Sequence, residues 1–199
     1  MSKGRETRQA ILYRAVDLTS QVGLEGLSIG VLAKRAGMSK SGLYAHFGSK
    51  EELQREVLDA AADRFVDVVM APAFREPRGL PRVERLFELW MWWGTQELSG
   101  GCPFVAAASD FEDRLGPVRD HLIVHLDDLL KEVAKTAQIA IDEGHFRPDL
   151  DVQQFAYEFW ALVVVHQHYS KLFGYPRANE RARAAFERMV RDACQAPVH

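Results

Sequence analysis

The chain has 199 residues, 47% of them hydrophobic and 27% charged, a composition typical of a globular protein with a buried core. Its apolar runs are shorter than the roughly 20 residues that a membrane-spanning helix needs, and the N-terminus lacks the apolar segment of a secretory signal. Cys102 and Cys194 are far apart, which argues against a disulfide framework or a zinc–cysteine cluster. We therefore expect a cytoplasmic protein.

Charge is distributed unevenly along the chain. The net charge of the whole chain is −3, but residues 1–50 contain four lysines and four arginines against three acidic residues. These fifty residues therefore carry +5, and residues 51–199 carry −8. A cationic N-terminal segment on an acidic body indicates binding to a polyanion, although a chance excess on a solvated face would give the same count.

The first fifty residues are predicted to form a helix-turn-helix unit. Apolar residues at helical spacing predict a first helix: Ile11, Ala15, Leu18 and Val22. Gly23 should end that helix. Ser28 can cap a short second helix that Gly37 ends, because glycine readily adopts a positive φ. Ser39 can cap a third helix over residues 39–47, and two short helices joined by a tight turn define the motif.

The third predicted helix has one apolar face and one small-residue face. Leu43 and Phe47 share the face that packs inward, whereas Ser41 and Ala45 lie opposite, flanked by a glycine and a tyrosine. Such a surface allows a helix to enter the major groove of DNA, which is about 12 Å wide. The alternative is that the aromatic residues of this helix only fill a small core.

Position along this helix predicts how each residue meets DNA. Lys40 and Ser41 lie at its N-terminal end, where recognition helices reach base edges. Tyr44, His46 and Lys50 are better placed to hold phosphates.

The segment Leu27–Leu53 closely resembles the DNA-binding domain of the TetR family of transcriptional regulators. The resemblance covers about residues 5–60 and rests on closely spaced positions: Ala33 and Gly37, then Gly42-Leu-Tyr-Ala-His-Phe47, then Ser49-Lys-Glu-Glu-Leu53. It implies DNA contacts from Ser28, Lys40, Ser41, Gly42 and Tyr44, and contacts with the DNA backbone from His46 and Lys50. Ser39, which caps the third helix, is included in the expected DNA-binding set. Gly30 departs from the family pattern, because several relatives carry a polar or basic side chain there. A contact from the second helix is therefore expected to be missing.

The rest of the chain is predicted to be helical throughout. A helix near 50–70 buries a face made of Leu53, Val57, Ala61 and Phe65, and a loop over residues 71–81 follows. Further helices are expected over these ranges: 82–98, a short one from Pro103, 117–142, 151–173 with a capping box of Asp151 and Gln154, and 178–194.

This pattern predicts an all-α fold of about nine helices. Residues 1–50 form a three-helix DNA-binding domain, 51–70 a linking helix, and 71–199 a larger ligand-binding and dimerisation domain. The last two helices are expected to form a homodimer, because the run Ala161–Val165 leaves little polar face and Ala182 and Ala185 allow close helix packing. The alternative is that these helices are central within one chain.

A small-molecule effector site is expected in the C-terminal domain. Apolar walls with a few polar groups are typical of such pockets, and the candidate lining residues are Trp90, Trp93, Phe104, Phe111, His125, Trp160 and Tyr169. Aromatic residues at helical spacing are also common core residues, so that interpretation stays open for each of them.

No catalytic motif, cofactor or metal is expected. The chain lacks a Walker loop, a nucleophile elbow and a dinucleotide fingerprint. His121 and His125 have a spacing that can bind a metal, but solvated or partner-bonded histidines are the favoured interpretation. The sequence thus predicts a repressor that a small molecule releases from a palindromic DNA operator. The alternatives are an activator, or control by a protein partner or by oxidation of Cys102.

Overall fold

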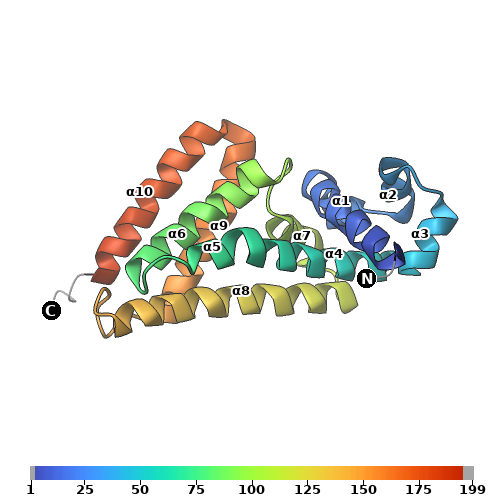
Figure 1. The fold of residues 1–199 in the computed structure, drawn as a ribbon. Coiled ribbons are helices and arrows are strands. Elements are labelled where there is room, and N and C mark those ends of the chain that lie inside the picture. Colours follow the sequence, from blue (N-terminus) through green and yellow to red (C-terminus); the bar gives the residue numbers. More distant parts are fainter. Residues whose placement is uncertain (1–2, 195–199) are drawn as a thin grey trace. The chain divides into compact units, whose positions relative to one another are not determined.

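The structure is a computed structural model that describes residues 3–194, and all regular elements in this range are helices. Nine of them have eight residues or more (Figure 1): α1 (Lys3–Gly26), α2 (Ile29–Ala36), α3 (Lys40–Phe47), α4 (Lys50–Phe65), α6 (Leu80–Trp92), α7 (Pro103–Phe111), α8 (Pro117–Asp142), α9 (Val152–Phe173) and α10 (Tyr175–Cys194). The all-α prediction is confirmed. None of the described helices is long and apolar enough to cross a membrane.

The chain divides into two compact units. The first comprises Met1–Phe65 and Gln96–Leu126, and the second comprises Val66–Thr95 and Asp127–His199. The first unit therefore contains α7 and the start of α8 in addition to the four N-terminal helices. The predicted division placed those later segments with the C-terminal domain; in the structure α7 packs directly against α1.

The core of the first unit follows the apolar periodicity of the sequence. Leu53, Val57, Ala61 and Phe65 are all fully buried on one face of α4, as predicted. Helix α1 packs against this helix and against α2.

Helix α1 is interrupted at Gly23, whose φ of 75° and ψ of 164° are not helical. One further turn follows, so the prediction that Gly23 ends the helix describes the break but not this last turn. The carboxylate of Asp110, in α7, accepts a hydrogen bond from the backbone N–H of Glu25 at 3.1 Å. A side chain of α7 thereby caps the final turn of α1.

Several helix ends differ from the predictions. The helix expected to reach residue 70 changes at Val66–Met70 into a π-helical stretch, and α6 continues into another at Trp93–Glu97. A three-residue helix, α5 (Ala71–Ala73), lies within the expected loop. Helix α10 begins at Tyr175, three residues earlier than predicted, because Pro176 is tolerated in a first helical turn.

The predicted capping box at α9 is only half formed. The carboxylate of Asp151 accepts hydrogen bonds from the backbone N–H groups of Gln153 and Gln154, at 2.9 and 3.0 Å. The side chain of Gln154 does not return to Asp151 but donates to Glu158 at 2.8 Å. The cap itself is as predicted, and its reciprocal bond is replaced by a contact along the helix.

Aromatic side chains fill the core of the second unit. The rings of Phe87 and Phe186 are stacked with centroids 3.9 Å apart, and Phe159 meets both edge-on. Trp90 lies against Phe159 and Trp160. Helices α6, α9 and α10 are thus joined by one aromatic cluster.

Candidate nucleic-acid interface

Helices α2 and α3 form the predicted helix-turn-helix, with both caps made as expected. The hydroxyl of Ser28 accepts a hydrogen bond from the N–H of Val31 at 3.2 Å, and that of Ser39 accepts from the N–H of Gly42 at 3.1 Å. Between the helices Gly37 adopts a left-handed conformation with φ of 67°, which allows the sharp turn. These local interactions fix the orientation of α3 after α2.

Helix α3 has the two faces that its sequence predicted. The side chains of Leu43 and Phe47 are buried, whereas Tyr44 is 55% exposed and Ser41 and Ala45 are also exposed. The outer face therefore presents small side chains with one aromatic ring, as expected of a helix that enters the major groove of DNA.

The side chain of Lys40 lies close to Gly30, the position in the second helix that lacks the polar or basic side chain of several relatives. A Cβ atom added at Gly30 would lie 3.2 Å from Cε and 3.6 Å from Nζ of Lys40, so the lysine side chain passes over the start of α2. The absence of a side chain at Gly30 makes room for it. One cationic group thus lies near the starts of both short helices.

Lys50, at the first turn of α4, is held by the end of α1. Its ammonium group donates to the backbone carbonyl of Glu25 at 2.8 Å and lies 3.2 Å from the Glu25 carboxylate. Arg114 binds the same carboxylate at 3.0 Å. Burial alone would raise the pKa of Glu25, but hydrogen bonds and charges from Lys50 and Arg114 outweigh it and leave this pKa below its usual value.

The remaining predicted DNA-contacting residues lie on or beside α3. His46 is half-buried, with its ring 6.2 Å from that of Phe47. Ser39 and Ser41 are exposed, and their hydroxyl oxygens are 3.2 Å apart. The structure therefore places the predicted set at the N-cap of α2, at the N-cap and along the length of α3, and at the start of α4, with Lys50 paired with Glu25.

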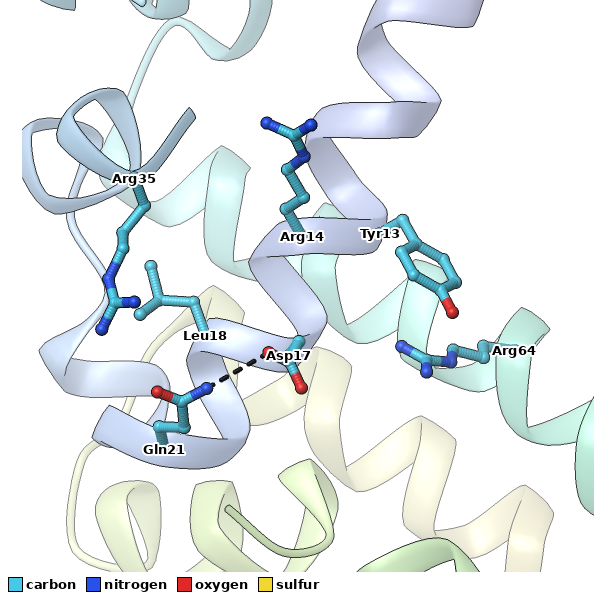
Figure 2. Close-up of a pocket in the computed structure, with 7 residues that line it drawn as sticks. All are labelled: Tyr13, Arg14, Asp17, Leu18, Gln21, Arg35 and Arg64. Carbon is cyan, nitrogen blue, oxygen red and sulfur yellow. Dashed lines mark hydrogen bonds between the residues drawn. The ribbon is translucent and has the colours of Figure 1, made fainter. Parts of the chain in front are cut away.

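A polar hollow in the first unit was not predicted. It has a volume of about 340 Å³, and Figure 2 shows the side chains that line it: Tyr13, Arg14, Asp17, Leu18, Gln21, Arg35 and Arg64. The guanidinium group of Arg64 lies 4.1 Å from the centre of the Tyr13 ring, and Gln21 donates to Asp17 at 3.1 Å. Three arginines in one hollow are unlike the apolar surroundings expected for the effector. Its members come from three separate helices, so helical periodicity carries no signal for it.

The predicted effector-binding residues fall into separate groups. In the second unit Trp90 and Trp160 are in contact, with ring centroids 6.1 Å apart. In the first unit the ring centroids of Phe104 and His125 are 6.0 Å apart. Phe111 lines a separate hollow of about 300 Å³ together with Lys50 and Arg114.

Four of these seven residues behave as core residues: Trp90, Trp93, Phe104 and Phe111. Tyr169 is partly exposed and packs its ring 4.5 Å from that of Phe173. The effector site therefore stays a prediction.

Together the helical fold and the outer face of α3 define a helix-turn-helix protein. Residues 11–57 match the family model of bacterial regulatory proteins of the tetR family, and residues 79–186 match the tetracyclin repressor-like C-terminal domain. The chain belongs to the TetR family and is a DNA-binding transcriptional regulator.

Individual relatives agree with this assignment. The HTH-type transcriptional regulator RutR of Escherichia coli (strain K12) is 30% identical over 185 residues, covering 82% of this chain and 73% of that protein. A TetR transcriptional regulator from Chloroflexus aurantiacus J-10-FL has a TM-score of 0.83 at 22% identity, over 96% of this chain and 95% of that one. AibR in complex with isovaleryl coenzyme A and operator DNA has a TM-score of 0.72 at 21% identity, over 94% of this chain and 98% of that one. At these identities the two structural likenesses show the fold.

Proposed function

We propose that this regulator is a homodimeric repressor that binds a palindromic operator through α3 and is released by a small molecule. In this proposal each part of the predicted division has its own role. Residues 1–50 bind DNA, residues 51–70 connect the two domains, and residues 71–199 bind the effector and form the dimer. The two matched family models, over residues 11–57 and 79–186, are compatible with it.

The observation that carries the DNA-binding proposal is the outer face of α3. Tyr44, Ser41 and Ala45 are exposed there while the apolar residues of the same helix are buried. A binding partner that covers this face would explain why the Tyr44 ring is exposed among small side chains. The net charge of +5 over residues 1–50 suits a polyanion as that partner.

Release by a small molecule requires that the molecule bind one state of the protein better than the other, since equal affinity shifts no equilibrium. The structural neighbour AibR forms a complex with both isovaleryl coenzyme A and operator DNA. By analogy, an effector of this chain is proposed to occupy the C-terminal domain, near the predicted aromatic residues. Control by oxidation of Cys102 is less well supported, because that thiol is buried.

The test is selection of genomic DNA fragments by the purified chain at stated salt, followed by sequencing. We expect one shared palindrome with half-sites about 34–36 Å apart or a multiple of that spacing. Salt-sensitive binding without a shared sequence would contradict the proposal of operator recognition.

The Tyr44 side chain provides the matched variants for this test. Tyr44→Ala removes an exposed ring and its hydroxyl, whereas Tyr44→Phe removes only the hydroxyl. We expect Tyr44→Ala to weaken binding to the recovered site by about tenfold or more, and Tyr44→Phe to weaken it less, as measured by fluorescence anisotropy. Wild-type affinity in both variants would remove α3's outer face from the interface.

A further inference from the structure

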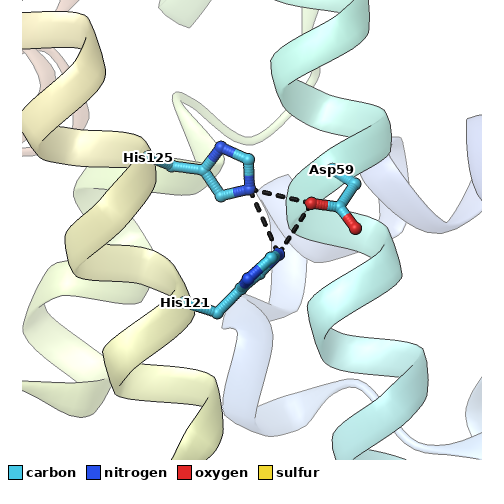
Figure 3. A group of neighbouring side chains, drawn as sticks. All are labelled: Asp59, His121 and His125. Atoms are coloured by element: carbon cyan, nitrogen blue, oxygen red, sulfur yellow. Dashed lines mark hydrogen bonds and ion pairs between the residues drawn. The ribbon is translucent and has the colours of Figure 1, made fainter.

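Three side chains of types that can bind a metal ion converge from two helices in the first unit. Asp59 is on α4, and His121 and His125 are on α8, with one ligand atom of each within 4.8 Å of the others. Nε2 of His121 lies 2.6 Å and Nε2 of His125 lies 2.9 Å from Oδ1 of Asp59. Figure 3 shows the two imidazole rings and the carboxylate directed toward one point between the helices.

Each part of this arrangement has a simple origin. His121 and His125 are four residues apart in α8, so they share one helix face. In the sequence alone this spacing can bind a metal, but solvated or partner-bonded histidines are the favoured interpretation. The structure adds a carboxylate that lies 62 and 66 positions earlier in the chain, a separation at which no sequence spacing gives a signal.

Hydrogen bonding alone does not account for all the close contacts. The two Nε2 atoms are 3.3 Å apart, and both are close to the same carboxylate oxygen. These are three contacts, but each Nε2 carries at most one proton and an ionised carboxylate carries none. One contact therefore lacks a hydrogen, whereas a cation at the centre would accept a lone pair from all three atoms.

The separation of the nitrogen atoms fits a tetrahedral ion. Zinc–nitrogen bonds of about 2.0–2.1 Å give a ligand–ligand distance of about 3.3 Å at the tetrahedral angle. The imidazole pair already has this separation. The two nitrogen–oxygen distances are shorter, and Asp59, whose side chain is 52% exposed, is free to move outward by the roughly half ångström required.

The surroundings favour a partly open cation site. The side chains of His121 and His125 are 29% and 18% exposed, which leaves a solvent side for a further ligand. The centroid of the buried Phe104 ring lies 6.0 Å from that of the His125 ring. Glu56, one turn before Asp59, is already ion-paired with Arg8.

We propose that Asp59, His121 and His125 bind a divalent first-row transition-metal ion, with Zn²⁺ as the best fit. Two imidazoles and one carboxylate are a ligand set that zinc accepts, with water or another ligand in the fourth position. The bound ion joins α4 to α8. This site was not expected from the sequence, which predicted no metal.

The test uses the full chain without a polyhistidine tag, stripped of metal by a chelator that is then removed. Isothermal titration with Zn²⁺ should give one ion per chain, and Co²⁺ should give the visible absorption bands of a tetrahedral complex. We expect Asp59→Asn, His121→Gln and His125→Gln each to weaken Zn²⁺ binding by at least about tenfold. His168→Gln removes an exposed histidine on α9 and should bind Zn²⁺ like the wild-type chain.

Two results would overturn the proposal. One is the absence of stoichiometric Zn²⁺ binding by the wild-type chain, and the other is unchanged Zn²⁺ affinity in the three variants. Circular dichroism checks that each variant is folded, and the half-exposed Asp59→Asn is the variant least disturbing to packing. Zn²⁺ should also raise the midpoint of thermal unfolding of the wild-type chain but not of Asp59→Asn.

A consequence for DNA binding rests on the proposed function. Helix α4 begins three residues after the end of α3, the helix proposed to read the operator, so an ion that holds α4 to α8 should change the affinity for the operator. The metal site is measured without DNA, which separates the two proposals. Stoichiometric Zn²⁺ binding without a shared DNA site would contradict only the operator proposal, and the reverse result would contradict only the metal site.

Discussion

The ammonium group of Lys50 has enough hydrogen-bond donors both to pair with Glu25 and to make the predicted phosphate contact. An ammonium group has three N–H donors. In the structure one donates to the carbonyl of Glu25 and another faces the Glu25 carboxylate. The third remains for a phosphate, so the ion pair with Glu25 positions Lys50 without excluding the predicted DNA contact.

This arrangement predicts different results for the two partners of the ion pair. Lys50→Ala should weaken operator binding and make the negative slope of log K against log salt shallower by about 0.9 per bound chain, because one phosphate contact is lost. Glu25→Gln should leave that slope unchanged, since it removes no cation. The measurement is fluorescence anisotropy over a series of salt concentrations.

The control for Lys50→Ala is Lys135→Ala. Lys135 is exposed on α8 and paired with Glu132 at 3.3 Å, so its loss should change neither affinity nor slope. If Lys50→Ala and Glu25→Gln weakened binding equally with no change in slope, Lys50 would act only by holding the end of α1.

At the scale of the element, α1 is joined to α7 and to the loop that precedes α7. A Cβ at Gly100 would lie 2.1 Å from the carbonyl oxygen of Ser20, and the N–H of Gly100 donates to the Ser20 hydroxyl at 3.0 Å. Asp110 caps the turn that follows Gly23. These contacts link the first helix of the DNA-binding domain to a segment that the family model assigns to the C-terminal domain.

Substitution of Gly23 should measure how much this junction matters. Its φ of 75° and ψ of 164° are accessible almost only to glycine, and a Cβ there would lie 2.7 Å from the Asp110 carboxylate. We expect Gly23→Ala to lower the free energy of unfolding by about 1–3 kcal/mol, measured by urea denaturation.

Gly26→Ala is the matched control, three residues later in α1. A Cβ at that position would make only ordinary contacts, the nearest 3.4 Å away on Val22. We expect a change within about 0.5 kcal/mol, or a slight gain. An equal loss in both variants would show that the backbone conformation at Gly23 is not what the substitution perturbs.

Elements whose signals are local could be predicted from the sequence. The buried face of α4 and the caps at Ser28, Ser39 and Asp151 depend on spacing or on bonds within three residues, and all of them are present. The exposed face of α3 was predicted for the same reason, since Leu43 fixes which side turns inward.

Features that depend on distant partners were missed. Asp110 accepts a hydrogen bond from Glu25, which lies 85 positions earlier in the chain. Asp59 and His121 are 62 positions apart in the sequence. The π-helical stretch Val66–Met70 was missed because its apolar residues suit an α-helical period equally well. The sequence separation of Glu25 and Lys50 gave no indication that the two residues form an ion pair.

At the scale of the whole molecule, the proposed dimer depends on the exposed apolar side of α9. Tyr157 is 66% exposed, Val165 is 59% exposed and Leu172 is 74% exposed in the single chain. Ala182 of α10, expected to face a partner, is buried within the chain. The partner surface is therefore proposed to be formed mainly by α9, and covering these side chains in a second copy would remove apolar area from water.

Two exposed leucines allow a direct test of that surface. Leu172→Arg places a charge on the proposed interface and should convert the dimer to a monomer, whereas Leu115→Arg alters a leucine that is 90% exposed on the loop before α8 and should leave the dimer intact. Sedimentation velocity measures the oligomeric state of both variants.

The same variant also tests how the dimer contributes to DNA binding. Because two linked recognition helices bind a palindrome more tightly than one, monomeric Leu172→Arg should also lose at least about tenfold in operator affinity. A dimeric Leu172→Arg would place the interface elsewhere, and a monomeric wild-type chain would contradict a palindromic operator bound by a preformed dimer.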